Sequence, residues 1–177
     1  MSTPTTNLGL SKPAAGDTDW AAEINANFDV LDAMAYVSTP LYWNLLTTKP
    51  DSIGQGTWAR AQSSARLYGG DFSNTTTANS DNFTSNFRCP AGTYTLRFNA
   101  VKNTDAGIVK VYIDGVQVGT VGGYDEYAAL DPANIEEITG LVLTAGEHTL
   151  KFQLSGKNAS SSSYRFRTSG IWLQRTA

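Results

Sequence analysis

The stretch GIVKVYIDGVQVGTV, from Gly107 to Val121, decides the fold class of this chain. Two alternating apolar runs flank an Asp-Gly pair, which is typical of the two-residue turn of a β-hairpin. The resulting register forms cross-strand pairs, of which only the last lies on the polar face: Ile113 with Val116, Val111 with Val118, Val109 with Thr120, and Tyr112 with Gln117. Turn chemistry and apolar pairing agree, so we predict an antiparallel hairpin with one buried face.

Period-two alternation continues outside the hairpin. In TYTLRFNA (Thr93–Ala100), every second residue is apolar or aromatic, which predicts a half-buried strand with these residues inward: Tyr94, Leu96, Phe98 and Ala100. The stretches AGTYTLRF (Ala91–Phe98) and AGEHTLKF (Ala145–Phe152) match at Ala, Gly, Thr, Leu and Phe. Each predicts a turn that leads into a strand. They are either a duplication or two turns that solve one geometric problem.

The last predicted strand, in YRFRTSGIWLQRT, has a phase problem. It contains two apolar pairs of opposite parity: Tyr164 with Phe166, and Ile171 with Leu173. A regular strand cannot bury both pairs on one face. One extra residue reverses the alternation, and glycine tolerates the dihedral angles involved. We therefore predict a β-bulge near Ser169-Gly170.

These patterns together predict eight or nine strands separated by turn signals. The predicted strands are 58–62, 65–68, 84–89, 93–101, 108–114, 116–121, 135–143, 149–154 and 164–175. This density favours a two-sheet jelly-roll sandwich over residues 57–177. The predicted fold class is therefore mainly β, preceded by a short N-terminal α-helical attachment segment.

Residues 1–37 form that attachment segment. Asp17, Thr18 and Asp19 offer helix-capping side chains, and the apolar residues that follow recur at spacings of four, four, three and three: Trp20, Ile24, Phe28, Leu31 and Met34. This spacing places them on one face of a helix. Because such a helix is marginal alone in water, we expect its apolar face to contact another chain. Residues 38–56 are predicted to be a linker packed on a neighbour.

Composition disfavours several classes of partner. The chain has 177 residues, 41% of them apolar, with 13 Lys+Arg, 16 Asp+Glu and a net charge of −3. This charge does not favour nucleic acid or an anionic membrane. No apolar window approaches the ~18 residues that span a bilayer, and no secretory signal is visible. Cys89 is alone, which excludes an internal disulfide. We expect a soluble protein made in the cytoplasm.

The sequence contains no recognisable catalytic motif. The single histidine, His148, takes the place in the second repeat stretch that Tyr94 holds in the first, which favours a structural role. Two carboxylates alone can hydrolyse glycans. However, none of the acids between residues 125 and 137 stands in an apolar sequence context that would raise its pKa: Asp125, Glu126, Asp131, Glu136 and Glu137. We predict that the protein is not an enzyme.

No cofactor is predicted either. Four aspartates in predicted loops could supply oxygen ligands to calcium: Asp71, Asp81, Asp105 and Asp131. Their spacing does not match a calcium-binding loop. We therefore expect no metal, with calcium as the alternative.

The longest insertion between strong strands is GGYDEYAALDPAN (Gly122–Asn134). Sugars are held by aromatic faces and by polar groups that bond hydroxyls. This loop supplies both kinds of group in four consecutive residues: Tyr124, Asp125, Glu126 and Tyr127. We predict a glycan-binding site there. The alternative is that both tyrosines anchor the loop or form a subunit contact.

The opening stretch, TTNLGLSKPAAGDTDWAAEINANFDVLDAM, resembles the N-terminal segment of many tailed-bacteriophage virion proteins, chiefly tail-fibre-like ones. The likeness consists of N-x-G-x-x-K-P, then Gly-Asp, a Trp, an Asn and FD-x-[IL]-D. It is carried by Asn7, Gly9, Lys12, Pro13, Trp20, Asn25, Asn27, Phe28, Asp29 and Asp32. Leu10 stands where an aromatic residue is common.

A second resemblance runs from Gly92 to Arg175. The stretches GTYTLRFNAVKN, VKVYIDGVQVGTV, LTAGEHTLKFQLSGKNASSSSYRF and GIWLQR are similar to jelly-roll modules of the carbohydrate-binding, galactose-binding-like type. Together the two resemblances imply a bacteriophage virion structural protein of the tail-fibre or capsid-decoration type. Proteins of this design are commonly trimers, which implies a homotrimer with virion partners contacted through residues 1–50.

We therefore predict a non-enzymatic virion protein that is anchored by its N-terminal segment. Its β-sandwich would be displayed for adhesion to host-surface glycans or for particle stabilisation. A free carbohydrate-binding module is the alternative, and a polysaccharide depolymerase is a less favoured one.

Overall fold

The computed structural model describes residues 50–61, 71–129 and 133–176, together with Ile24 and the backbone of 3–4, 11–12 and 42–44. The chain divides into two compact units, residues 1–41 and 42–177. In the first unit, β1 (Thr3–Pro4) pairs antiparallel with β2 (Ser11–Lys12). Ile24 is helical and 37% exposed. The other residues of the predicted apolar helix face lie outside the described part: Trp20, Phe28, Leu31 and Met34. Within the described residues, no helix is long and apolar enough to cross a membrane.

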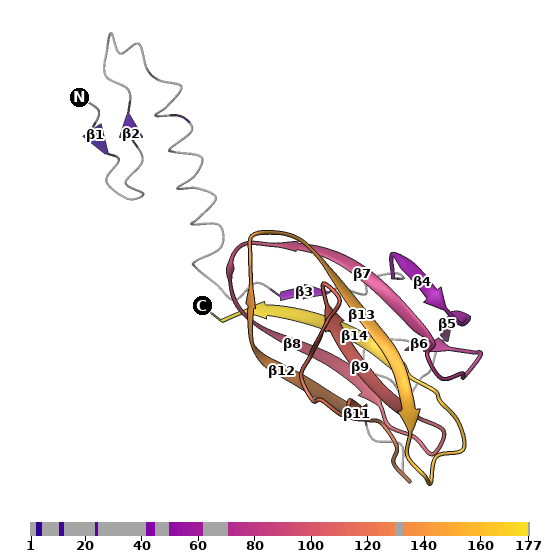
Figure 1. Ribbon diagram of the computed structural model, residues 1–177. Helices are drawn as coiled ribbons and strands as arrows, with labels where there is room; N and C mark the ends of the chain where they lie inside the picture. The colour runs from indigo at the N-terminus through magenta and orange to yellow at the C-terminus, as the bar shows by residue number, and fades with distance from the viewer. Residues whose placement is uncertain are drawn as a thin grey trace. The chain divides into compact units, whose positions relative to one another are not determined.

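The described part of the second unit is a sandwich of two antiparallel sheets (Figure 1). One sheet, called here the β9 sheet, has the order β10 (Val116–Val118), β9 (Gly107–Ile113), β13 (Gly146–Lys157), β7 (Asn82–Cys89) and β4 (Ser52–Gln55), with β11 (Tyr124–Asp125) also paired to β9. The other, the β8 sheet, has the order β12 (Ala133–Leu143), β8 (Gly92–Val101), β14 (Arg167–Arg175), β6 (Asp71–Asn74) and β5 (Trp58–Ala61), with β3 (Tyr42–Asn44) also paired to β14. The predicted two-sheet jelly-roll sandwich is confirmed.

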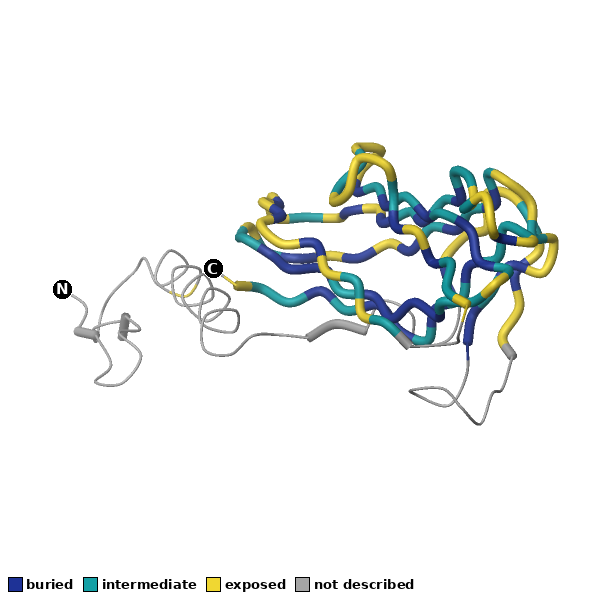
Figure 2. Tube along the Cα trace, turned by 90° about the horizontal axis from the view of Figure 1, so that it is seen from below, coloured by how far each residue is buried: buried dark blue, intermediate teal, exposed yellow. Residues whose placement is uncertain are grey.

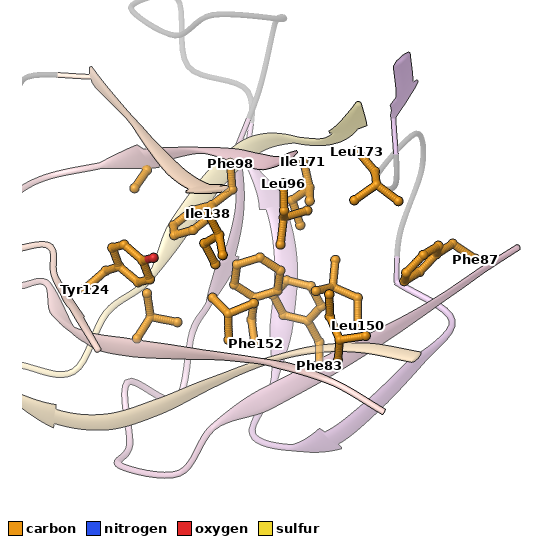
Figure 3. Close-up of a cluster of buried hydrophobic side chains, with 14 of the residues drawn as sticks. Phe83, Phe87, Leu96, Phe98, Tyr124, Ile138, Leu150, Phe152, Ile171 and Leu173 are labelled. Carbon is orange, nitrogen blue, oxygen red and sulfur yellow. The ribbon is translucent and has the colours of Figure 1, made fainter. Parts of the chain in front are cut away.

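The core lies between the facing sides of these sheets (Figure 2), and aromatic rings fill its centre (Figure 3). Phe83 and Phe152 of the β9 sheet stack with their centroids 5.3 Å apart. Phe152 also meets Phe98 of the β8 sheet edge-on at 5.1 Å, and Phe166 stacks on Phe152 at 5.7 Å. Such pairs contribute about 0.5–1.5 kcal/mol each beyond the burial of their area. The rings therefore hold the two sheets together.

The alternation predicted for β8 is confirmed on its inner face. Four side chains there are fully buried, with 0% exposure: Tyr94, Leu96, Phe98 and Ala100. The outer face is less exposed than the alternation predicted, since Thr95 and Asn99 are also buried. The reason is that β8 is a central strand, with β12 on one side and β14 on the other.

The two matching sequence stretches occupy equivalent positions, one in each sheet. Tyr94 donates from Oη to the carbonyl oxygen of Pro90, four residues back, at 2.7 Å. In the same way, Nε2 of His148 bonds the carbonyl oxygen of Thr144 at 3.0 Å. His148 is only 6% exposed. The geometry matches the structural role that the sequence predicts for this histidine.

The hairpin between β9 and β10 has the predicted turn. Asp114 and Gly115 both have positive φ, at 50° and 81°, as a two-residue hairpin turn of this type requires. The predicted pairs nearest the turn are confirmed: Val116 with Ile113, Gln117 with Tyr112, and Val118 with Val111. The outermost predicted pair is wrong, because β10 ends at Val118 and Val109 pairs instead with Tyr124 of β11.

The β-bulge predicted near Ser169-Gly170 is also confirmed. The pairing of β14 with β8 shifts register between Thr168 and Gly170, and Phe166 and Ile171 are both buried as a result. A second bulge in β12, between Ile138 and Leu141, was not predicted.

Several short strands escaped prediction. The strands β3 and β4 lie within residues 38–56, for which the sequence predicted a linker. The strands β6 and β11 lie in predicted loops. The strand β11 has 2 residues and β6 has 4, too few to show a period of two. The predicted strand 65–68 lies outside the described residues.

Candidate functional site

An open groove lies at the edge of the sandwich, where β10 and β11 of one sheet face β12 of the other. It has a volume of about 470 Å³ and is lined by Val118, Gly119, Thr120, Tyr124, Glu137, Ile138, Thr139 and Leu141. Ile138 and Leu141 are buried and form an apolar floor. The polar part of the lining consists of the Thr120 and Thr139 hydroxyls and the Glu137 carboxylate. The size is within the usual range for small-molecule sites.

Tyr124 contributes to the groove from the β9 sheet. Its ring is only 9% exposed and packs edge-on against Phe98 with centroids 5.2 Å apart (Figure 3). Its Oη accepts a long hydrogen bond from the backbone N–H of Thr120 at 3.4 Å. A Cβ on Gly119 would lie 2.2 Å from this Oη, so only glycine fits there. The Tyr124 ring therefore belongs to the core.

Glu137 contributes from β12. Its Oε2 accepts a hydrogen bond from Nε of Arg97 at 2.6 Å, and the two side chains are 43% and 32% exposed. Nη1 of Arg97 also donates to Oε1 of Gln174. Arg97 thus holds the Glu137 carboxylate in place beside the groove.

Glu126 occupies a different environment from the other predicted glycan-binding residues. It is 1% exposed, and neither carboxyl oxygen has a hydrogen-bond partner in the described part of the chain. Burial raises the pKa of Glu126 to about 8, and the carboxylates of Glu136 and Asp125 add to this, while Lys102 lowers it. The prediction that no acid here has a pKa-raising environment is therefore wrong for Glu126. Burial also removes this carboxyl from any sugar at the surface.

Asp125 and Tyr127 lie where three loops meet. Asp125 is exposed, and its Oδ2 accepts a hydrogen bond from Nδ2 of Asn158 at 2.7 Å. Its Oδ1 accepts from the backbone N–H of Tyr127 at 3.0 Å. Lys102 donates to the backbone carbonyl of Asp125 at 3.3 Å. The four residues predicted as one glycan site thus divide, with Tyr124 at the groove, Glu126 buried, and Asp125 and Tyr127 in this loop junction.

The aspartates considered as calcium ligands have separate partners. Oδ2 of Asp81 accepts from Nδ2 of Asn74 at 2.8 Å. Oδ2 of Asp105 accepts from Arg165 at 3.0 Å and from Arg167 at 3.1 Å. Asp131 lies outside the described residues. In the described ranges, which include Asp71, Asp81 and Asp105, no three His, Cys, Asp or Glu residues come close enough to hold a metal ion together.

Sequence reasoning missed most of the groove. Thr120 and the β12 residues Glu137 and Thr139 are separated by a loop in sequence, and no local pattern unites them. The only hints in the sequence near the groove are two glycines, Gly119 and Gly140. In the structure they have positive φ, 75° and 70°, and lie at the turn and at the β12 bulge beside the groove.

No protein-family profile matches this chain, and a comparison with curated proteins finds no match. Among solved structures, a xanthan lyase from Paenibacillus matches 80% of the chain at a TM-score of 0.65 and 20% identity, over 14% of the lyase. The CBM36-1 domain of a multidomain xylanase, from the hindgut metagenome of Trinervitermes trinervoides, matches 78% of the chain and 98% of its own length, at a TM-score of 0.53 and 13% identity. A GH26-CBM35 β-(1,4)-mannanase of Podospora anserina matches 78% of the chain and 28% of its own length, at 0.50 and 15%.

These matches define the class by fold. The chain has the jelly-roll fold of carbohydrate-binding modules, since it covers nearly all of the CBM36-1 domain. It spans only 14% of the lyase and 28% of the mannanase, so it corresponds to a part of each enzyme.

Proposed function

We propose that this chain is a non-enzymatic carbohydrate-binding module that holds a glycan in the groove beside Tyr124 and Glu137. The observation that carries the proposal is the groove lining, which combines an apolar floor with hydroxyl and carboxylate groups. Sugars present the matching surfaces, because each ring has C–H faces and a rim of hydroxyls. The fold shared with the CBM36-1 domain supports the proposal.

In this proposal a sugar enters the groove above Ile138 and Leu141, and its polar contacts dominate because these two side chains are buried. The Glu137 carboxylate accepts hydrogens from its hydroxyls, and Thr120 and Thr139 exchange hydrogen bonds with them. Because Arg97 already fixes Glu137, the carboxylate loses little side-chain freedom when a sugar binds.

A binding role fits the groove better than hydrolysis does. Glycoside hydrolysis normally requires two carboxyl groups that flank the scissile bond. Glu137 is the sole acid among the residues that line the groove. Glu126 has the raised pKa of a general acid, but its carboxyl oxygens are buried and cannot meet a substrate.

The test is glycan binding by groove variants. Isothermal titration calorimetry with xylohexaose, mannohexaose and partially hydrolysed xanthan should detect binding by the wild type to at least one of them. Glu137→Gln and Thr139→Ala should each weaken that binding about tenfold, the effect of losing roughly one hydrogen bond to a charged or polar group. Thr84→Ala, on β7 away from the groove, is the matched control. Equal affinity in all three variants would reject the groove as the site.

A second candidate function is attachment to a virion through residues 1–37. It is supported by the sequence resemblance of that segment and by the exposure of Ile24, one of the residues of the predicted apolar helix face. In this proposal the protein is a homotrimeric appendage that displays the module to host-surface glycans. Deletion of residues 1–36 should abolish incorporation into particles and leave glycan binding intact. Incorporation of the truncated protein would reject this second proposal.

A further inference from the structure

The outer face of the β8 sheet carries a row of large side chains that continues from the groove. Glu137 on β12 pairs in register with Arg97 on β8, and Arg97 pairs with Trp172 on β14. The sequence neighbours of Arg97 and Trp172 point into the core, because Leu96 and Leu173 are fully buried. By the alternation of a strand, the row therefore lies on the opposite, outer face.

The Trp172 indole lies on this face, above Gly170. A Cβ on Gly170 would lie 2.8 Å from Cζ2 and 3.1 Å from Cη2 of the indole, so the six-membered ring lies over this glycine. Gly170 does not have positive φ, which means that its role here is close approach and not an unusual backbone conformation. The β14 bulge places it there. Trp172 is half-buried and keeps part of its surface exposed.

Polar residues of β8 pair with this part of β14. Arg97, which pairs in register with Trp172, bridges Glu137 and Gln174. Asn99, which pairs in register with Gly170, is 1% exposed. Its Oδ1 accepts from Oγ of Ser169 at 2.8 Å, but its Nδ2 has no hydrogen-bond partner. Because this donor is buried, an ordered water could satisfy it, whereas a surface ligand could not reach it.

Glu137 belongs to both surfaces, because it lines the groove and also begins the row. From β12 to β14 is two strand spacings, roughly 10 Å, which exceeds the width of a single sugar ring. The charges of Arg97 and Glu137 balance each other, which favours a neutral ligand.

We propose that the groove and the Trp172 face form one extended site for an internal stretch of a neutral polysaccharide. One sugar unit lies in the groove, the chain crosses the Arg97–Glu137 pair, and a later unit stacks on the indole. This inference rests on the proposed glycan-binding function and specifies its ligand as a chain of several units.

The test uses the indole N–H signals of the full chain in ¹H–¹⁵N NMR spectra, with xylohexaose and mannohexaose as probes. Trp58 is 8% exposed in the core and is the internal reference. The Trp172 signal, assigned with Trp172→Phe, should shift on titration while the Trp58 signal stays. Hexasaccharide should bind about tenfold more tightly than disaccharide, the worth of roughly one aromatic contact.

Two variants address the stacking surface. Trp172→Ala removes the ring, and Gly170→Ala displaces it while keeping the indole. Each should reduce the affinity gain from disaccharide to hexasaccharide, and Thr84→Ala should not. If a probe shifts the backbone amide signals of Thr120 and Thr139 but not the Trp172 indole signal, the extended site is wrong. The groove would then remain the binding site. If neither probe shifts any signal, that result counts against both proposals.

Discussion

His148, which is buried, and Asp114, which is exposed, form an ion pair that closes the β9–β10 turn onto β13. Nδ1 of His148 donates to Oδ2 of Asp114 at 2.6 Å, and Nε2 donates to the carbonyl oxygen of Thr144 at 3.0 Å. Both partners accept hydrogens only, so the two bonds form together when the ring carries a proton on each nitrogen, as an imidazolium. The backbone N–H of Thr149 completes the arrangement with a bond to Oδ1 of Asp114 at 2.8 Å.

This ion pair makes stability depend on pH. Burial opposes the charged ring, but hydrogen bonds to Asp114 and Thr144 outweigh it and raise the pKa of His148 above 6.5. The folded state therefore holds this proton more tightly than the unfolded state does. The stabilisation is complete below pH 6.5 and is lost as the pH rises through the raised pKa. We expect His148→Gln to cost about 1 kcal/mol at pH 6, discounted for the exposure of Asp114, and less at pH 9. Urea unfolding across this range checks the prediction, and a pH-independent cost would contradict it.

Glu126 also links stability to pH. Its pKa is raised from 4.5 to about 8, so the unfolded chain ionises first as the pH rises. The stabilisation is present below pH 4.5 and declines up to pH 8, by at most about 1.4 kcal/mol per pH unit. Glu126→Gln should flatten this part of the profile. The control is Glu137→Gln, at a position whose side chain is 43% exposed. The idea fails if wild type and Glu126→Gln show parallel profiles.

Gly123 and the adjacent Gly122 provide a matched pair. Gly123 has φ of 87°, and a Cβ there would lie 2.8 Å from both the Ile108 side chain and the Val109 carbonyl oxygen. At Gly122 a Cβ would meet nothing within 4 Å. We expect Gly123→Ala to lower the free energy of unfolding by about 2 kcal/mol or more, because strain and overpacking add. Gly122→Ala should change it by less than about 0.5 kcal/mol. Equal effects in thermal melts would contradict the placement of this turn.

Asn74 joins three segments at the other end of the core. It is 0% exposed, and its Nδ2 donates to Oδ2 of Asp81 at 2.8 Å and to the carbonyl oxygen of Tyr164 at 2.9 Å. Its Oδ1 accepts from the backbone N–H of Phe166 at 2.9 Å. Asn74→Ala leaves the Tyr164 carbonyl and the Phe166 N–H without this partner, while Oδ2 of Asp81 keeps its bonds from Thr76 and Ala78, and it should cost about 3 kcal/mol. The exposed Asn86 is the control, since Asn86→Ala should be nearly neutral. A cost for Asn74→Ala within the range of the control would refute this role.

The local features of the fold were predictable because short-range chemistry specifies them. The Asp114-Gly115 turn, the inward face of β8 and the bulge beside Gly170 all follow from alternation and turn preference over fewer than about fifteen residues. The outermost hairpin pair, Val109 with Thr120, was wrong because the alternation cannot reveal that β11 replaces β10 as the partner of β9.

Alternation and turn preferences could not predict most of the groove. Tyr124 was found as an aromatic residue in a long loop, but the loop pattern could not show that its ring packs on Phe98. The same holds for Glu126, whose polar sequence neighbours conceal a buried position. Glu137 becomes part of the groove only because β12 is an edge strand that lies opposite β10 and β11.

Period-two alternation thus established that this chain builds half-buried strands and which side chains of each face inward. It carries no information about strand order, because any order that buries the same faces satisfies the same pattern. The structure adopts one order, in which Phe83, Phe98, Phe152 and Phe166 pack together across the core. That choice placed two sheet edges around the groove and aligned Glu137, Arg97 and Trp172 on one face.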